Sequence, residues 1–228
     1  MKDFIQYINQ YSEFLRQSAV WHNTKDIIAP VIGIDDKEAA TDNYIYEFYC
    51  LIKILEDLRY NYEIRFVEGK GNFKYRFPQA AAPKGGKPRF HAFIDDKMEF
   101  QICAGTMIKC EIDTEKNHPD ISFQVAESSN DPSQEDLIII MDAKFKESQQ
   151  ASLPKDEVYK FGQIVDLFNL RREPQIKIKF SKYKSFLGNC LITNVASYSN
   201  NSDIRLLQKL RIKEVEKFSP TSNYNVLG

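Results

Sequence analysis

The chain has 228 residues, of which 43% are hydrophobic and 28% charged, and its formal net charge is −1. These values are typical of a soluble globular protein with one generous domain and a core of its own. The near-zero net charge excludes a wholly basic protein that coats nucleic acid, and no apolar run approaches the ~20 residues of a membrane span.

The cysteines and the N-terminus bear on localisation. Four cysteines are scattered without close pairing, and the chain begins Met1-Lys2-Asp3-Phe4 without the apolar segment of a signal peptide. We therefore expect a cytoplasmic protein with free thiols and no membrane partner.

Apolar residues at helical spacing predict two helices in the first sixty positions. The first extends from Lys2 to Val20. The second begins at Thr41 or Asp42, either of which is a good N-cap, and continues to about Leu58. The segment Ile27–Ile34 between them is predicted to be a connector. We expect residues 1–40 to form an N-terminal helical extension and residues 41–228 to form the main domain.

Strands are predicted from position 62 onward. Residues Tyr62 to Phe77 resemble a hairpin that turns at Gly69-Lys70-Gly71. Further strands are predicted at Phe90–Ile94, Glu99–Ile102, Met107–Ile112, Ile121–Ala126 and Leu137–Met141. The last of these is entirely apolar, which indicates a strand that is buried on both faces.

The remaining third of the chain predicts a helix from Pro154–Asp156 to about Leu170, closed by Pro174. Strands at Gln175–Phe180 and Cys190–Ala196 and a terminal helix at Asp203–Lys217 follow. This order of elements predicts an α/β fold in which helices flank a mixed β-sheet.

Charged residues end the most apolar strand. The alternation of side chains along a strand places Asp142 and Lys144 on one face. One interpretation is a structural Asp–Lys pair where the strand emerges into solvent. The other, which we favour because buried strands rarely carry charge without need, is a site for a hard divalent cation and a phosphate.

Two further acids could join that strand end. Asp120 follows Pro119 directly before Ile121–Ala126, where it could instead bond nearby turn amides. Glu47 lies at the N-terminal end of the helix stripe formed by Leu51, Ile54 and Leu58. A carboxylate there needs a metal or a lysine as partner, unless it reaches water at the rim or caps the helix with Asn43.

Together these residues resemble the PD-(D/E)XK nuclease superfamily, whose fold is called restriction endonuclease-like. Its pattern is an acid on a first core helix, then Pro-Asp, then Asp/Glu-x-Lys at a strand end, then a helix. The matching segments are Tyr46-Glu47-Phe48-Tyr49, His118-Pro119-Asp120-Ile121 and Met141-Asp142-Ala143-Lys144-Phe145. The following helix, with Tyr159-Lys160-Phe161-Gly162-Gln163, is similar to that of the restriction-type and McrC-like branches, in which a Lys or Gln faces the site. The resemblance covers about Thr41 to Phe180.

The resemblance implies an endonuclease that hydrolyses DNA with Mg²⁺, for which Mn²⁺ substitutes, in prokaryotic restriction or defence. It implies metal ligation by Asp120, Asp142, the Ala143 carbonyl and Glu47, catalytic roles for these acids with Lys144 and Gln163, and DNA contacts by Lys146 and Lys160. The alternatives are a nucleic-acid-binding module with a lapsed site, and a nuclease subunit of a larger complex driven by an ATPase or a targeting protein. A homodimer is compatible with each.

Overall fold

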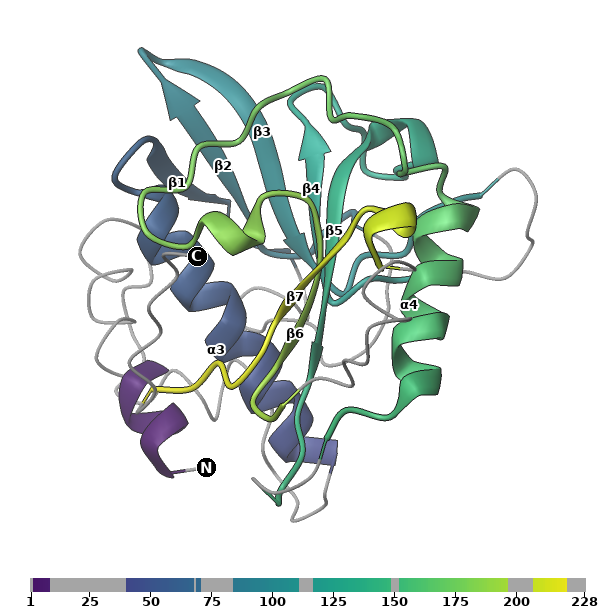
Figure 1. The fold of residues 1–228 in the computed structure, drawn as a ribbon. Helices are drawn as coiled ribbons and strands as arrows, with labels where there is room; N and C mark the ends of the chain where they lie inside the picture. The colour runs from purple at the N-terminus through teal and green to yellow at the C-terminus, as the bar shows by residue number, and fades with distance from the viewer. Residues whose placement is uncertain are drawn as a thin grey trace.

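The protein is described by a computed structural model in which residues 2–8, 40–67, 69–70, 84–110, 117–148, 152–196 and 207–220 are placed. At the centre of this part of the chain is a seven-stranded sheet whose strands follow one another in chain order (Figure 1). The strands are β1 (Glu63–Val67), β2 (Arg89–Ile94), β3 (Lys97–Ala104), β4 (Ile121–Val125), β5 (Leu137–Lys144), β6 (Asn189–Thr193) and β7 (Ile212–Val215).

The sheet is mixed. Strands β1 to β5 form an antiparallel meander, whereas β5, β6 and β7 are parallel to one another. Helix α4 (Lys155–Leu167) lies in the connection from β5 to β6, as a crossover between parallel strands requires. The coarse α/β class predicted from the sequence is confirmed.

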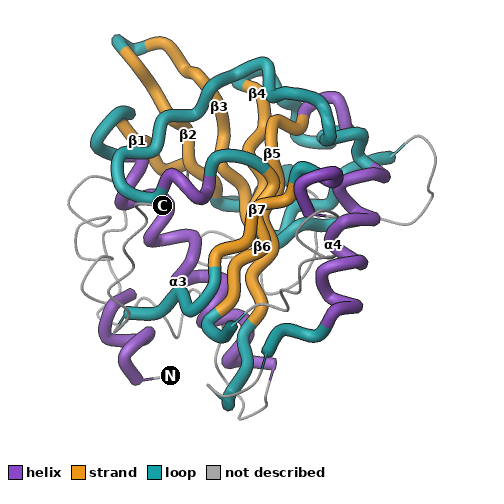
Figure 2. Tube along the Cα trace, viewed as in Figure 1, coloured by secondary structure: helices purple, strands orange, loops and turns teal. Residues whose placement is uncertain are grey.

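Two hydrophobic cores lie on the two faces of the sheet. Figure 2 shows a long helix on either side of the strands. Helix α3 (Ala40–Leu58) contributes Leu51, Ile54 and Leu58 to the first, and α4 contributes Val158, Phe161 and Val165 to the second. All five residues of Leu137–Met141 are buried, as predicted, and from Ile139 onward they alternate between the two cores.

The N-terminal helix of residues 2–8 belongs to the α3 core. Phe4 and Ile8 are buried there, and the ring of Phe4 packs edge-on against Tyr46 and Tyr49 with centroid distances of 5.5 and 4.9 Å. The rest of the predicted first helix, and the connector Ile27–Ile34, lie outside the described residues.

Most predicted elements are confirmed within a few residues: α3, the β2–β3 pair, β4, β5, α4 and β6. Strand β1 is confirmed, and its partner in the described sheet is β2. The second arm of the predicted hairpin, at residues 71–77, lies outside the described residues. The prediction of a strand at Met107–Ile112 is wrong for residues 107–110, where Ile108 and Lys109 make only isolated bridges, and residues 111–112 are not described.

Two predictions in the last third of the chain are wrong. Residues 175–180 join no ladder of the described sheet, and their apolar alternation arises because Ile178 and Phe180 are buried in the α3 core. Of the predicted terminal helix, residues 203–206 lie outside the described residues and residues 207–210 are helical, but Arg211 then takes a positive φ of 54° and β7 begins. A helix cannot continue through that left-handed residue, so Ile212 and Val215 enter the sheet instead.

Candidate active site

The β4–β5 pairing brings together two acids that are 22 positions apart. Asp120 directly precedes β4, and Asp142 lies in the last three residues of β5. Because Ile121 pairs with Met141 in antiparallel register, position 120 lies opposite position 142. The backbone N–H of Ala143 donates a hydrogen bond of 2.8 Å to Oδ2 of Asp120. The sequence motif Pro-Asp is therefore attached to the end of β5.

Asp142 and Lys144 form an ion pair on β5. The Nζ atom of Lys144 lies 2.7 Å from Oδ2 of Asp142, and the two side chains are 29% and 13% exposed. The pair forms because the two residues project from one strand face, as the alternation predicts. Partial burial makes this contact stronger than an ordinary surface ion pair.

Glu47 reaches the same cluster from helix α3. Its stripe partners Leu51, Ile54 and Leu58 are buried, as predicted, which turns this side of α3 toward the sheet. Burial, together with the charge of Asp142, raises the pKa of Glu47 to about 8, while Lys144 acts in the opposite direction. Of the alternatives considered, the structure supports a carboxyl group among charged partners rather than one that simply reaches water.

Asp120 is a half-buried acid of the cluster. Its pKa is raised well above the ordinary value by burial, by the neighbouring charges of Asp142 and Glu47, and by a hydrogen bond with Asp142. Three carboxyl groups thus surround one ammonium group. If all were ionised, negative charge would be in excess, which is costly in a partly buried site.

The donor chemistry of the cluster fits a magnesium ion. In the described part of the chain, no three His, Cys, Asp or Glu side chains form a ready-made ligand group. Mg²⁺ does not need one, because it keeps several waters and binds through one or two carboxylates. Asp120 and Asp142 would be those ligands, and the Ala143 backbone already lies against Asp120. A bound Mg²⁺ ion would neutralise the excess negative charge of the carboxylates.

Two residues that the sequence interpretation missed belong to this site. Tyr44, half-buried and one turn before Glu47 on α3, has a pKa raised by burial and by the charges of Glu47 and Asp120. Glu157, in the first turn of α4, acts electrostatically on Lys144. The i,i+3 relation to Glu47 could have identified Tyr44. No comparable signal identified Glu157.

Lys160 and Gln163 are not brought to the carboxyl groups. Helix α4 turns Val158, Phe161 and Val165 toward the sheet, so positions 160 and 163 lie on its exposed side. Lys160 is 62% exposed and pairs with Asp156 at 3.6 Å. The expectation that they face the site finds no support in the geometry of the described residues.

Lys146 lies just beyond the end of β5, as predicted from its place in the sequence. It is half-buried, two positions beyond Lys144, and its backbone is held by the side chain of Asn194 through hydrogen bonds of 2.8 and 2.7 Å.

Comparison of the chain with protein-family models, with curated proteins and with solved structures gives no match. None of the helices in the described segments combines the length and apolar character that a membrane crossing needs. The function is therefore inferred from the site.

Proposed function

We propose that the chain is a metal-dependent endonuclease that hydrolyses the phosphodiester bonds of DNA. The observation that carries this proposal is the convergence of Glu47, Asp120, Asp142 and Lys144, from one helix and two neighbouring strands, on one end of β5. Carboxylates that can hold a hard cation, beside an ammonium group that can face a phosphate, are the groups that phosphodiester hydrolysis uses.

The order of the elements supports the restriction endonuclease-like assignment. An acid lies on α3, Pro119-Asp120 directly precedes β4, Asp142-Ala143-Lys144 ends β5, and α4 follows. This is the order of the superfamily pattern, now with three acids and a lysine in one neighbourhood. The correspondence of α4 is limited to its position, since Glu157 acts electrostatically on Lys144 whereas Lys160 and Gln163 lie on the exposed side of the helix.

Asp120 and Asp142 would hold the metal ion, with Mg²⁺ or Mn²⁺ as the candidates. When bound, the ion supplies Lewis-acid polarisation of the scissile phosphate and lowers the pKa of bound water.

Lys144 is suited to stabilise charge rather than to accept a proton. Burial acts to lower the pKa of Lys144, but Asp142 and Asp120 outweigh it, so the pKa is raised and the group stays cationic. A cation fixed at this position can stabilise the charge that develops on a phosphate. Glu47, whose pKa without a bound ion is about 8, titrates near neutral pH and is the better candidate for a group that exchanges a proton.

The test is cleavage of supercoiled plasmid with Mg²⁺ or Mn²⁺, with EDTA as the metal-free control. We expect Asp142→Asn and Lys144→Ala each to lower the rate about 100-fold or more. Asp131→Asn is the matched control, because Asp131 is 67% exposed and pairs with Lys109 away from the site.

Cleavage that survives in Asp142→Asn would contradict the assignment of the site. Tight duplex binding without cleavage in either metal would instead identify a nucleic-acid-binding module with a lapsed site.

A further inference from the structure

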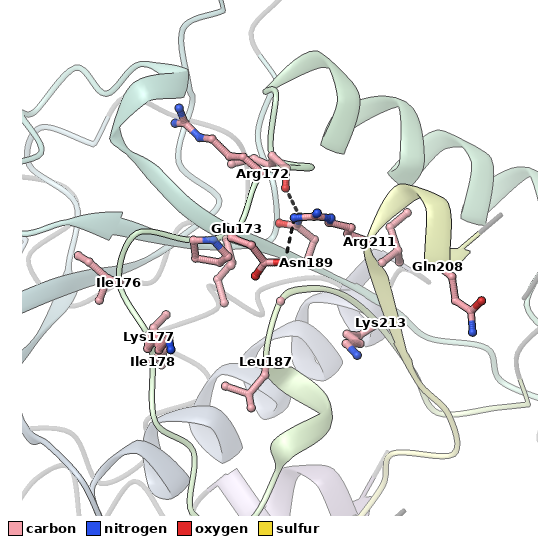
Figure 3. A pocket seen from close by; sticks show the side chains of 15 residues that line it. Arg172, Glu173, Ile176, Lys177, Ile178, Leu187, Asn189, Gln208, Arg211 and Lys213 are labelled. Atoms are coloured by element: carbon pink, nitrogen blue, oxygen red, sulfur yellow. Dashed lines mark hydrogen bonds and ion pairs between the residues drawn. The ribbon is translucent and has the colours of Figure 1, made fainter. Parts of the chain in front are cut away.

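A cavity lies at the end of the parallel strands opposite to Asp142 and Lys144. It measures about 830 Å³ and is open to solvent beside the first residues of β6 and β7 (Figure 3). Asn189 and Ile212, which begin these strands, contribute to its lining, whereas Asp142 and Lys144 end β5. One wall is the segment that follows α4, residues 171–183, here called the strap, which crosses the strand ends in Figure 1. The cavity is called the strap groove.

The interior of the strap groove is mainly apolar. Ile139, Ile178 and Ile212 contribute to it from β5, from the strap and from β7. Leu187, at its edge, is 43% exposed, and no other leucine or isoleucine of the described residues is exposed to this extent. A cavity of this size with an apolar lining is in the range of ligand-binding sites.

The rim of the strap groove is cationic. Four basic side chains and one acidic side chain line it: Arg172, Lys177, Arg211, Lys213 and Glu173. Glu173 already pairs with Arg211 at 2.9 Å, as Figure 3 shows, and Arg172 lies 3.4 Å from Glu135 outside the groove. Lys177 and Lys213 form no ion pair with any residue that the structure places. The groove therefore complements an anionic occupant.

The strap also presents unused backbone groups. Within the described segments, residues 175–178 make no backbone hydrogen bond, although Ile176, Lys177 and Ile178 line the groove. Farther along, the strap is fixed: Lys179 donates its N–H to the Tyr62 hydroxyl at 2.8 Å. Unpaired N–H and C=O groups beside an apolar cavity are what an added peptide chain can pair with.

We propose that the strap groove binds an acidic peptide segment of a partner protein. An apolar side chain of the segment would occupy the apolar interior of the groove. The carboxylates of the segment would face Lys177 and Lys213, and its backbone would pair with residues 175–178. A nucleic acid suits the groove less well than a peptide, because a phosphate backbone would leave the apolar interior of the groove exposed to water. The bound segment would leave Asp142 and Lys144 accessible, so this inference is independent of the proposed nuclease activity.

The experiment uses the full chain and a fluorescein-labelled hexapeptide of alternating leucine and glutamate, measured by fluorescence anisotropy. We expect saturable binding that weakens as salt is added. The double substitution Lys177→Glu, Lys213→Glu should weaken binding at least tenfold, and Leu187→Ser should weaken it as well. Lys184→Glu is the matched control, because this lysine is exposed and does not line the groove.

Two further arms separate the possible occupants. A backbone N-methylated form of the same peptide should bind more weakly if the strap pairs with the peptide backbone. A single-stranded oligonucleotide is added as competitor, and its direct binding to both charge variants is measured.

Failure of the peptide to bind, or equal binding to the Lys177→Glu, Lys213→Glu variant, would overturn the proposal. So would an oligonucleotide that displaces the peptide and depends on the same two lysines. Plasmid cleavage should be unchanged in this variant, which keeps the outcome distinct from that of the nuclease test.

Discussion

The backbone N–H of Ala143 donates a 2.8 Å hydrogen bond to Asp120, which fixes this carboxyl group against the end of β5. Asp120 also shares a hydrogen bond with Asp142. Two carboxyl groups can share such a bond only when one of them holds a proton. Without metal, a proton therefore relieves the repulsion between Asp120 and Asp142, and a divalent cation could take its place.

Magnesium should therefore stabilise the folded protein. We expect a melting temperature that rises with Mg²⁺ concentration, as for any ligand that binds only the folded state, by about 2–4 °C for each kcal/mol of binding. Asp142→Asn should lose most of this shift. Asp120→Asn should lose it too while still folding, because its amide oxygen can accept the Ala143 hydrogen bond. A shift of equal size in Asp142→Asn and in the Asp131→Asn control would place the ion elsewhere.

Metal-free stability should depend on pH through Glu47. Its pKa is about 8 in the folded chain and 4.5 in the reference state, so between these values the folded chain holds the extra proton. The stabilisation that comes from the raised pKa of Glu47 is fully present below pH 4.5 and is lost as the pH rises toward about 8. Glu47→Gln removes the dependence. The unfolding free energy of wild type relative to that of Glu47→Gln should fall by on the order of 2–4 kcal/mol between pH 4.5 and about 8.

Urea unfolding in EDTA at several pH values measures this difference, and the comparison of two chains cancels the contributions of groups that do not interact with Glu47; the response of Asp120, whose pKa Glu47 helps to raise, is included in the difference. A difference that does not change with pH would show that Glu47 is solvated like a surface acid.

Three of the four main site residues were predictable because each depends on a local rule. Strand alternation places Asp142 and Lys144 together, and helix periodicity turns Glu47 toward the sheet. The contact of Asp120 with β5 depends on the strand register, for which the sequence provides only a motif and no geometry. That register is set by the packing of the strands against both cores.

The errors have a different physical origin. The rotation of α4 about its axis decides whether Glu157 or Lys160 acts electrostatically on Lys144, and this rotation is set by the burial of Val158, Phe161 and Val165. At residues 176–180 the apolar alternation of a strand is present, but its backbone has no neighbouring strand in the described sheet. Periodicity reports which side chains are buried, not whether the backbone has a partner.

Asp57 should be a major determinant of stability because it anchors the strap to α3. It is 1% exposed and accepts hydrogen bonds from the Ser181 hydroxyl and, at 2.8 Å each, from the N–H groups of Lys182 and Tyr183. Asp57→Ala leaves these donors without a partner and should cost about 2–4 kcal/mol of unfolding free energy. Asp57→Asn keeps one acceptor oxygen and should cost less. Urea unfolding of both variants checks this, and equal losses would mean that packing rather than hydrogen bonding holds the strap.

Gly162 should tolerate a methyl group but not a larger side chain. It is buried in α4, where an added Cβ would lie 2.7 Å from Cδ1 of Leu210 and 3.5 Å from Cδ1 of Ile212. In Gly162→Ala, a helix-propensity gain of about 1 kcal/mol offsets the shift that the end of the Leu210 side chain must make, so stability should change little. Gly162→Leu gains similar propensity but overpacks the contact, and should destabilise the protein by about 1–3 kcal/mol. Thermal unfolding of the pair measures the difference. If both variants were as stable as wild type, residues 207–212 would not pack against α4, and the placement of β7 at the edge of the sheet would need revision.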